Sequence, residues 1–142
     1  MISAKSIIRV RYAETDMMGI AYYGNYFTWF EVARIRLLDD LGTPYRELEE
    51  QGFRLPVLET KAEYKQPARF DDEVEIKTFL KEMPTVRFTI DYELYVESKL
   101  ITTGYTSHAF TNLEGQPTKP PEIFKTRLNK YFPPKDRQLN DA

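Results

Sequence analysis

The sequence predicts an α+β fold in which a curled antiparallel sheet wraps around one long helix. Three observations favour this class. A strand-like segment comes first, a single long amphipathic helix follows over residues 25–41, and four long segments after residue 52 have the two-residue period of strands. Consecutive long strands after one major helix are typical of a sheet that packs on that helix.

The first strand is predicted over residues 6–12, where Ile8, Val10 and Tyr12 share one face and Arg9 and Arg11 share the other. Because the side chains of a strand alternate between two faces, this pattern indicates one apolar and one charged side.

The long helix is predicted to begin at Asn25, which suits the N-cap position. Its helical period comes from residues spaced three and four apart, namely Phe27, Phe30, Arg34, Leu37, Leu38 and Leu41. Gly42 and Pro44 predict the end of the helix. A short second helix is predicted over residues 45–51, before Gly52.

The remaining strands are predicted over residues 54–65, 73–80, 86–96 and 100–111, with a hairpin turn at 97–99. Pro56 marks the first of them as an edge strand or a bulged strand. Residues 112–121 are expected to form a loop, and residues 121–132 a terminal helix or an irregular tail. We therefore expect one domain over residues 1–132 and a polar C-terminal tail over residues 133–142.

Composition excludes several classes of function. The 142 residues carry a net charge of −2, which gives no general attraction to nucleic acid or anionic membrane. No apolar run approaches the roughly 20 residues of a membrane span, and the N-terminus does not look like a signal peptide, so a cytoplasmic location is expected. Without cysteine, and with His108 as the only histidine, the chain is expected to need no metal and no other cofactor.

One major helix can cover only one face of the predicted sheet. The other face and the open strand edges need cover as well, so a homodimer or homotetramer is expected.

Asp16 is the main candidate for chemistry, because it lies in the turn between the first strand and the long helix. A helix N-terminus offers unpaired N–H groups and a partial positive charge, which can hold a developing oxyanion. A carboxylate beside it can attack a carbonyl or deprotonate water. An aspartate in a turn also often does no more than accept nearby N–H groups.

Two motifs resemble the hotdog-fold acyl-CoA thioesterases, and most closely the 4-hydroxybenzoyl-CoA thioesterase and YbgC-like branch. The first is Tyr12-x-x-Thr15-Asp16-x-x-Gly19-x-x-Tyr22-Tyr23-x-Asn25-Tyr26-x-x-Trp29-Phe30-Glu31-x-Ala33-Arg34. The second is Tyr64-x-x-Pro67-Ala68-x-x-Asp71-Asp72-Glu73. The resemblance covers residues 7–112. It implies a hotdog fold, dimers that pair into tetramers, active sites at the dimer interface, and metal-free hydrolysis of an acyl-CoA or acyl-carrier thioester.

The resemblance also implies residue roles. Asp16 is the nucleophile, giving a mixed anhydride, or the general base on water, and the sequence leaves both open. Tyr23 supplies its backbone N–H to the thioester carbonyl. YbgC-like members often have histidine at the position of Tyr23, so this chain has no imidazole there unless His108 approaches. The mechanism then depends on Asp16 and on backbone dipoles.

Other residues have two interpretations each. Gly19 allows a tight backbone path around the acyl group, or is a plain turn glycine. Met18, with Met17, shapes an adaptable acyl pocket or simply packs. Glu31 forms an ion pair with Arg34 across one helical turn, or is a second carboxylate of the site. His108 is expected to make a structural hydrogen bond.

Two alternatives to a thioesterase remain open from sequence. A hotdog hydratase or dehydratase needs an acid–histidine pair, and His108 is far along the chain from Asp16. A non-catalytic acyl-thioester-binding protein keeps the fold without turnover. The sequence does not identify the acyl group.

Overall fold

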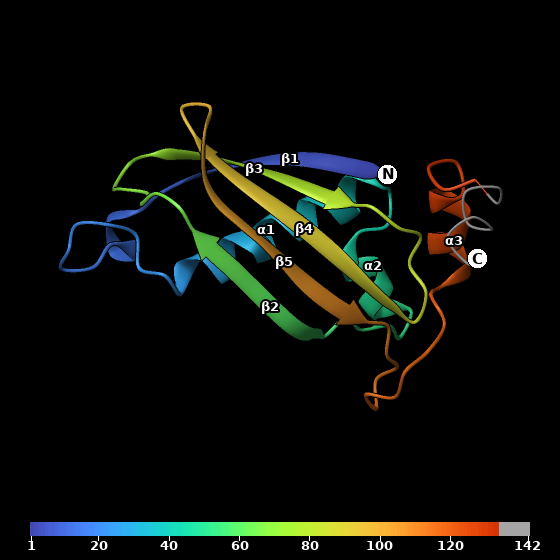
Figure 1. Ribbon diagram of the computed structural model, residues 1–142. Helices are drawn as coiled ribbons and strands as arrows, with labels where there is room; N and C mark the ends of the chain where they lie inside the picture. The colour runs from blue at the N-terminus through green and yellow to red at the C-terminus, as the bar shows by residue number, and fades with distance from the viewer. Residues whose placement is uncertain (134–142) are drawn as a thin grey trace.

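Five strands form one antiparallel sheet in the order β1-β3-β4-β5-β2 in the computed structural model, which describes residues 1–133 (Figure 1). The strands are β1 (Ile2–Arg9), β2 (Val57–Tyr64), β3 (Glu73–Leu80), β4 (Arg87–Val96) and β5 (Lys99–Ala109). The helices are α1 (Asn25–Asp40), α2 (Tyr45–Glu50) and α3 (Glu122–Leu128). The predicted α+β class is confirmed. Most of the predicted polar tail, residues 134–142, lies outside the described residues.

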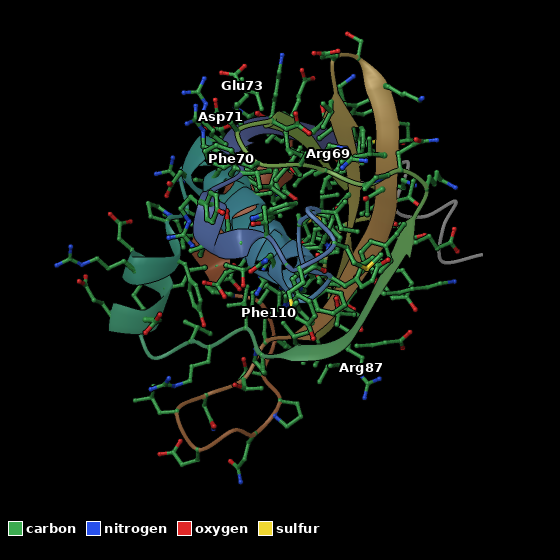
Figure 2. The ribbon with its side chains drawn as sticks, turned by 90° about the vertical axis from the view of Figure 1, so that its left-hand side faces the viewer. Arg69, Phe70, Asp71, Glu73, Arg87 and Phe110 are labelled. Atoms are coloured by element: carbon green, nitrogen blue, oxygen red, sulfur yellow. The ribbon has the colours of Figure 1, made fainter. Side chains whose placement is uncertain are left out.

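The core lies between α1 and the sheet, which curves around one side of this helix (Figure 2). The helix buries the face that carries Tyr26, Trp29, Phe30, Ala33, Leu37 and Leu38. Alternate residues of β3 are buried as well: Val74, Ile76, Thr78 and Leu80. The three- to four-residue period of α1 thus meets the two-residue period of the strands across one apolar layer.

Phe30 brings α1 into close contact with the sheet. Its ring stacks on the Tyr92 ring with a centroid distance of 4.3 Å and an interplanar angle of 6°. It also lies over Gly104 of β5, where an added Cβ would be 2.7 Å from the ring and would collide with the Lys61 carbonyl. Gly104 therefore lets the helix approach the sheet where any side chain would hold it away.

Two local predictions at the N-terminal end are wrong. The first strand runs over residues 2–9 instead of 6–12, and the chain then leaves the sheet through a 3₁₀ turn at Tyr12–Glu14. Asn25 is the first helical residue instead of the N-cap, and Gly24 precedes it. Asn25 does not cap the helix because its side chain makes a tertiary contact instead. Its side-chain amide donates to the Glu14 carbonyl oxygen at 2.7 Å.

The later elements follow their predicted positions closely. Strand β3 has the predicted bounds, α2 ends one residue early, and Glu97 and Ser98 form the hairpin turn with positive φ angles. The C-terminal segment contains a helix, α3, which decides between the two alternatives for residues 121–132.

Strand β2 is an edge strand, as Pro56 predicted. It pairs only with β5, has an irregularity in register between Val57 and Glu59, and exposes every residue except the half-buried Ala62. Its outer edge is therefore unpaired in a single protomer.

None of the helices in residues 1–133 is long and apolar enough to cross a membrane.

His108 belongs to a buried chain of hydrogen bonds, which confirms its predicted structural role. Its Nδ1 lies 3.2 Å from the Leu55 carbonyl oxygen and its Nε2 lies 2.8 Å from the Thr106 hydroxyl. Because a carbonyl only accepts, Nδ1 carries the proton and Nε2 of the neutral ring accepts from Thr106. The Tyr92 hydroxyl, 2.7 Å from Thr106, then donates to Thr106.

The buried hydrogen-bond chain of His108 predicts that the stability of the folded protein depends on pH. Burial lowers the pKa of His108 from 6.5 to about 4, with Arg34 adding to the shift and hydrogen bonding to the Leu55 carbonyl opposing it. The unfolded chain binds the proton first, so stability should fall as pH decreases from about 6.5 to about 4. Between pH 7.5 and pH 5 the loss due to His108 should be about 2 kcal/mol.

Urea unfolding of wild type and His108→Gln at the two pH values measures this loss. We expect the difference between pH 7.5 and pH 5 to shrink in the variant by that amount. An equal pH dependence in the two proteins would contradict a neutral buried imidazole.

Candidate active site

The connection between β1 and α1 forms a small hairpin at one end of the molecule (Figure 1). The Tyr22 N–H donates to the Glu14 carbonyl at 2.8 Å, and the Asp16 N–H donates to the Ile20 carbonyl at 2.9 Å. Thr15 and Ala21 form a bridge between these two bonds. The hairpin thus places Asp16 on one arm and the residues that lead into Tyr23 on the other, at the start of α1.

Asp16 is partly buried, and only one of its carboxylate oxygens is engaged. Oδ1 accepts the Met18 N–H at 2.9 Å, which is the turn-forming bond expected of an aspartate here. Within residues 1–133, Oδ2 accepts no hydrogen bond. One oxygen therefore orients the carboxylate while the other is free for a substrate or a water molecule.

Gly19 closes this turn in a left-handed conformation, with φ of +79°. An added Cβ would have nothing within 4 Å, so the backbone angle, and not a lack of space, requires glycine. Met17 and Met18 beside it are strongly exposed, at 105% and 74%. The structure therefore brings Met18 into the loop next to Asp16 but into no pocket of the same protomer.

The two residues just before α1, Tyr23 and Gly24, present open N–H groups within residues 1–133. In the part of the chain that the structure describes, neither the Tyr23 N–H nor the Gly24 N–H donates a hydrogen bond. The Tyr23 carbonyl, in contrast, accepts from the Tyr26 N–H at 3.2 Å and from the Tyr64 hydroxyl at 3.3 Å. The Tyr22 carbonyl accepts from the Asn25 N–H at 3.0 Å, so the Tyr22–Tyr23 and Tyr23–Gly24 peptides are both held by their oxygens. Their N–H groups, those of Tyr23 and Gly24, remain available to an oxyanion.

Aromatic rings surround this helix start. The Tyr23 and Tyr64 rings lie 4.6 Å apart, and Tyr64 also packs on Tyr26 at 4.9 Å. Together with Ile20, Lys65, Gln66 and Pro67 they line a hollow of about 310 Å³. Burial raises the pKa of both Tyr26 and Tyr64, so these hydroxyls stay protonated in the neutral range.

Glu31 lies elsewhere. It is two helical turns after Tyr23 and lines a separate cavity of about 460 Å³ that also includes Arg34, Ile35, Leu38, Leu55, Val57 and His108. The predicted Glu31–Arg34 ion pair is present at 3.9 Å. Within one protomer, therefore, the structure does not bring Glu31 to Asp16.

Glu14 is a residue of this region that the sequence analysis missed. The residue is only 6% exposed, and its carboxylate accepts the Arg11 backbone N–H at 2.8 Å and the Trp29 indole N–H at 3.0 Å. Burial alone would raise the pKa of Glu14, but these two bonds and the Arg11 side chain lower it below the ordinary 4.5. A glutamate directly before Thr15-Asp16, with the only tryptophan on the next helix, was the available signal.

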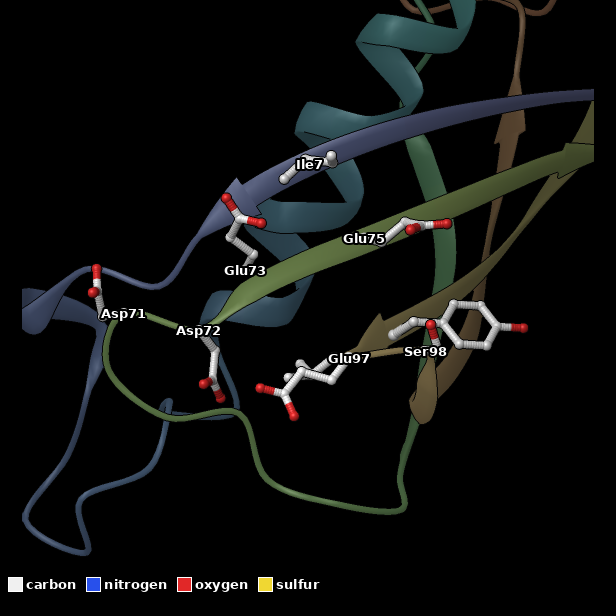
Figure 3. A pocket seen from close by; sticks show the side chains of 9 residues that line it. Ile7, Asp71, Asp72, Glu73, Glu75, Glu97 and Ser98 are labelled. Atoms are coloured by element: carbon white, nitrogen blue, oxygen red, sulfur yellow. The ribbon is translucent and has the colours of Figure 1, made fainter.

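A third hollow, near the ends of β1, β3 and β4, is acidic. Figure 3 shows that Asp71, Asp72, Glu73 and Glu97 surround it, and its volume is about 380 Å³. Among residues 1–133, no group of three potential ligands is arranged to hold a metal ion. The concentration of carboxylates also disfavours the phosphates of CoA at this place.

Comparison with known proteins identifies the family of this chain. The model of a family described as the thioesterase-like superfamily matches residues 10–128. The putative acyl-CoA thioesterase YneP of Bacillus subtilis is 37% identical over 92 residues, which are 65% of this chain and 67% of YneP.

Solved structures of thioesterases are also similar to this chain in fold. A DHNA-CoA thioesterase from Staphylococcus aureus is 34% identical with a TM-score of 0.81, over 99% of this chain and 91% of that chain. The 4-hydroxybenzoyl CoA thioesterase of Pseudomonas sp. strain CBS-3 has a TM-score of 0.79 over 88% of this chain and 98% of that one, and at 20% identity it supports the fold alone. The family model matches well over half of the length of the present chain. The chain therefore belongs to the thioesterase-like superfamily and has the hotdog fold.

Proposed function

We propose that this enzyme hydrolyses acyl-CoA thioesters with Asp16 as its working carboxylate and the start of α1 as its oxyanion site. The observation that carries the proposal is the pairing of a half-engaged carboxylate with open backbone donors. Asp16 has one free oxygen, and the Tyr23 N–H has no partner among the described residues. The names of the similar proteins, among them a putative acyl-CoA thioesterase and a DHNA-CoA thioesterase, support the same reaction.

In this mechanism the thioester carbonyl oxygen accepts the Tyr23 N–H, and the neighbouring Gly24 N–H is available to it as well. The positive end of the α1 dipole stabilises the negative charge that develops on this oxygen. Losing one such donor typically costs on the order of 3 kcal/mol of transition-state stabilisation. Because the donor is a backbone group, exchanging the Tyr23 side chain does not remove it.

Asp16 has two ways to complete the reaction. As a nucleophile it bonds to the carbonyl carbon, the thiolate leaves, and water hydrolyses the mixed anhydride to release the acid and free Asp16. As a general base it takes a proton from water while the water oxygen attacks the same carbon; the C–S bond then breaks, and the thiolate leaves and takes up the proton. Gly19 permits the tight turn that both routes require.

A second copy of the chain completes the site in this proposal. Tyr64 ends β2 beside the Asp16 region, whereas Val57 begins β2 beside the Glu31 cavity. If the open β2 edges of two copies pair antiparallel about a two-fold axis, the Tyr64 end of one meets the Val57 end of the other. The Glu31 cavity of each copy then lies next to Asp16 and Tyr23 of its partner and receives the acyl group, with Met18 at the junction.

A hydratase is less well supported by the geometry. His108 is 1% exposed and both of its ring nitrogens are engaged inside the protein. It therefore supplies no imidazole to Asp16. A protein that only binds acyl thioesters is separated from an enzyme by the activity measurements below.

The first prediction concerns Asp16→Asn. Asparagine keeps the shape and can still accept the Met18 N–H, but it neither attacks a carbonyl nor takes a proton from water. We expect kcat below about a tenth of wild type, a barrier increase of at least ~1.4 kcal/mol, with folding and oligomeric state unchanged. Release of free thiol from a panel of aromatic and aliphatic acyl-CoA and acyl-carrier thioesters measures this and identifies the acyl group and its carrier.

Asp40→Asn is the matched control, because Asp40 is an exposed carboxylate at the other end of α1 that pairs with Arg36. Its kcat should equal that of wild type. Retention of more than about a tenth of kcat in Asp16→Asn would refute the assignment of Asp16.

The second prediction concerns assembly. The wild-type chain should sediment as a dimer or a tetramer at micromolar concentration. Leu58→Lys places a charge on the open β2 edge, where Leu58 is 49% exposed, and should shift the protein toward monomer and lower activity in parallel. Leu113→Lys, at a 58% exposed position in the loop after β5, should change neither. A fully active wild-type monomer would contradict the shared site.

The third prediction concerns metals. In the proposed mechanism, Asp16 and backbone N–H groups perform the chemistry, and residues 1–133 include no three-ligand cluster. Activity should therefore survive exhaustive dialysis against EDTA. Loss of activity that a divalent ion restores would overturn this mechanism.

A further inference from the structure

We propose that Glu14 is a positioning residue that holds Asp16 and the Tyr23 N–H in their working arrangement. The inference rests on the proposed function of Asp16 and Tyr23, and it adds a residue that touches neither substrate nor reacting atoms. Its basis is a set of hydrogen bonds that converge on this one buried side chain and its own carbonyl group.

The side chain of Glu14 ties the Asp16 hairpin to the middle of α1. One carboxylate oxygen accepts the Arg11 backbone N–H at 2.8 Å, and the other accepts the Trp29 indole N–H at 3.0 Å. Trp29 is itself 2% exposed and packs on Tyr26 at 4.6 Å. The carboxylate is therefore fixed at both oxygens, one toward the end of β1 and one toward the helix.

The main chain of Glu14 ties the same hairpin to the start of α1. Its carbonyl oxygen accepts the Tyr22 N–H at 2.8 Å and the Asn25 side-chain amide at 2.7 Å. These two donors lie directly on either side of Tyr23 and Gly24, whose N–H groups form the proposed oxyanion site. One residue thus joins both ends of the peptide segment that holds the thioester oxygen.

Asp16 is only two residues after Glu14, so its place relative to Tyr23 depends on this anchor. Nucleophile, carbonyl carbon and oxyanion donor must be aligned closely, and a shift of about 1 Å can cost roughly 100-fold in rate. Exposed turn residues such as Met17 provide no comparable restraint. We therefore assign the alignment to the buried Glu14 anchor.

The anchor acts through alignment and not through proton transfer. At 6% exposure, with both oxygens engaged, the Glu14 carboxylate has no free face toward a substrate. Alignment is needed most in the transition state, whereas the surfaces that bind the substrate remain in place without it. A change at Glu14 should accordingly lower kcat far more than it raises KM.

Glu14→Gln tests this assignment. Glutamine keeps the size of the side chain but offers one oxygen, so its amide group faces either the Arg11 N–H or the Trp29 N–H, donor against donor. We expect kcat to fall by roughly 10- to 100-fold and KM to change by less than about threefold. Because the wild-type carboxylate is ionised across the neutral range, the factor should be the same from pH 6 to pH 8.

Trp29→Phe provides a second variant that removes the donor and keeps an aromatic ring. If Glu14 acts through Trp29, the kcat of the double variant Glu14→Gln/Trp29→Phe should stay close to that of the worse single variant. Independent effects would instead multiply. Sedimentation and circular dichroism establish that each variant is folded and assembled before its kcat is compared, and Asp40→Asn again serves as the control.

The outcomes separate this inference from the proposed function. An inactive Asp16→Asn together with a strongly lowered kcat in Glu14→Gln supports both. An inactive Asp16→Asn together with wild-type kcat in folded Glu14→Gln and Trp29→Phe overturns the role of Glu14 alone. An active Asp16→Asn overturns the proposed function, and complete inactivity of Glu14→Gln in that case would make Glu14 the working carboxylate.

Discussion

The packing of Phe30 on Tyr92 and over the bare backbone of Gly104 is the contact on which the rest of the structure depends. It brings the long helix α1 into close contact with the concave face of the sheet. Since α1 is rigid and packs along one apolar face, fixing it at Phe30 also fixes where its first turn lies, at the Tyr64 end of β2. The same burial that stabilises the core therefore determines where the open N–H groups of Tyr23 and Gly24 are presented.

Helix packing alone does not position the loop that carries Asp16, and the polar contacts of the β1–α1 connection do this. The chain leaves the sheet after Arg9, turns once, and returns as a short hairpin whose two arms are joined by backbone bonds. Apolar contacts are non-directional, whereas hydrogen bonds impose distances and angles, which is why a buried acid such as Glu14 suits this task. Its cost of burial is offset by donors from both sides of the connection.

Periodicity was enough to predict β3 and β4, because these strands bury one face and leave the other more exposed with little interruption. The long motif around Asp16 identified the loop, and Gly19 proved to have the left-handed backbone that its position suggested. The start of α1 was misread because the Asn25 side chain bonds to Glu14, eleven residues earlier, instead of to its own helix. The spatial separation of Glu31 from Asp16 was equally hidden, since sequence spacing along a helix gives no position relative to a distant turn.

The open edge of β2 connects assembly with chemistry. An unpaired strand that is exposed on both sides is an aggregation hazard unless something covers it, and pairing with a second copy removes that hazard. The Asp16 hairpin and the Glu31 cavity lie at opposite ends of this same strand, so antiparallel pairing is the operation that would bring them together. In the proposed site the two parts complement each other, because the hairpin offers Asp16 and the start of α1, whereas the Glu31 cavity, at about 460 Å³, is larger than the hollow of about 310 Å³ beside Tyr23. In this arrangement the contact that protects the edge would also assemble the site, which gives the exposed apolar residues Val57 and Leu58 a reason to be there.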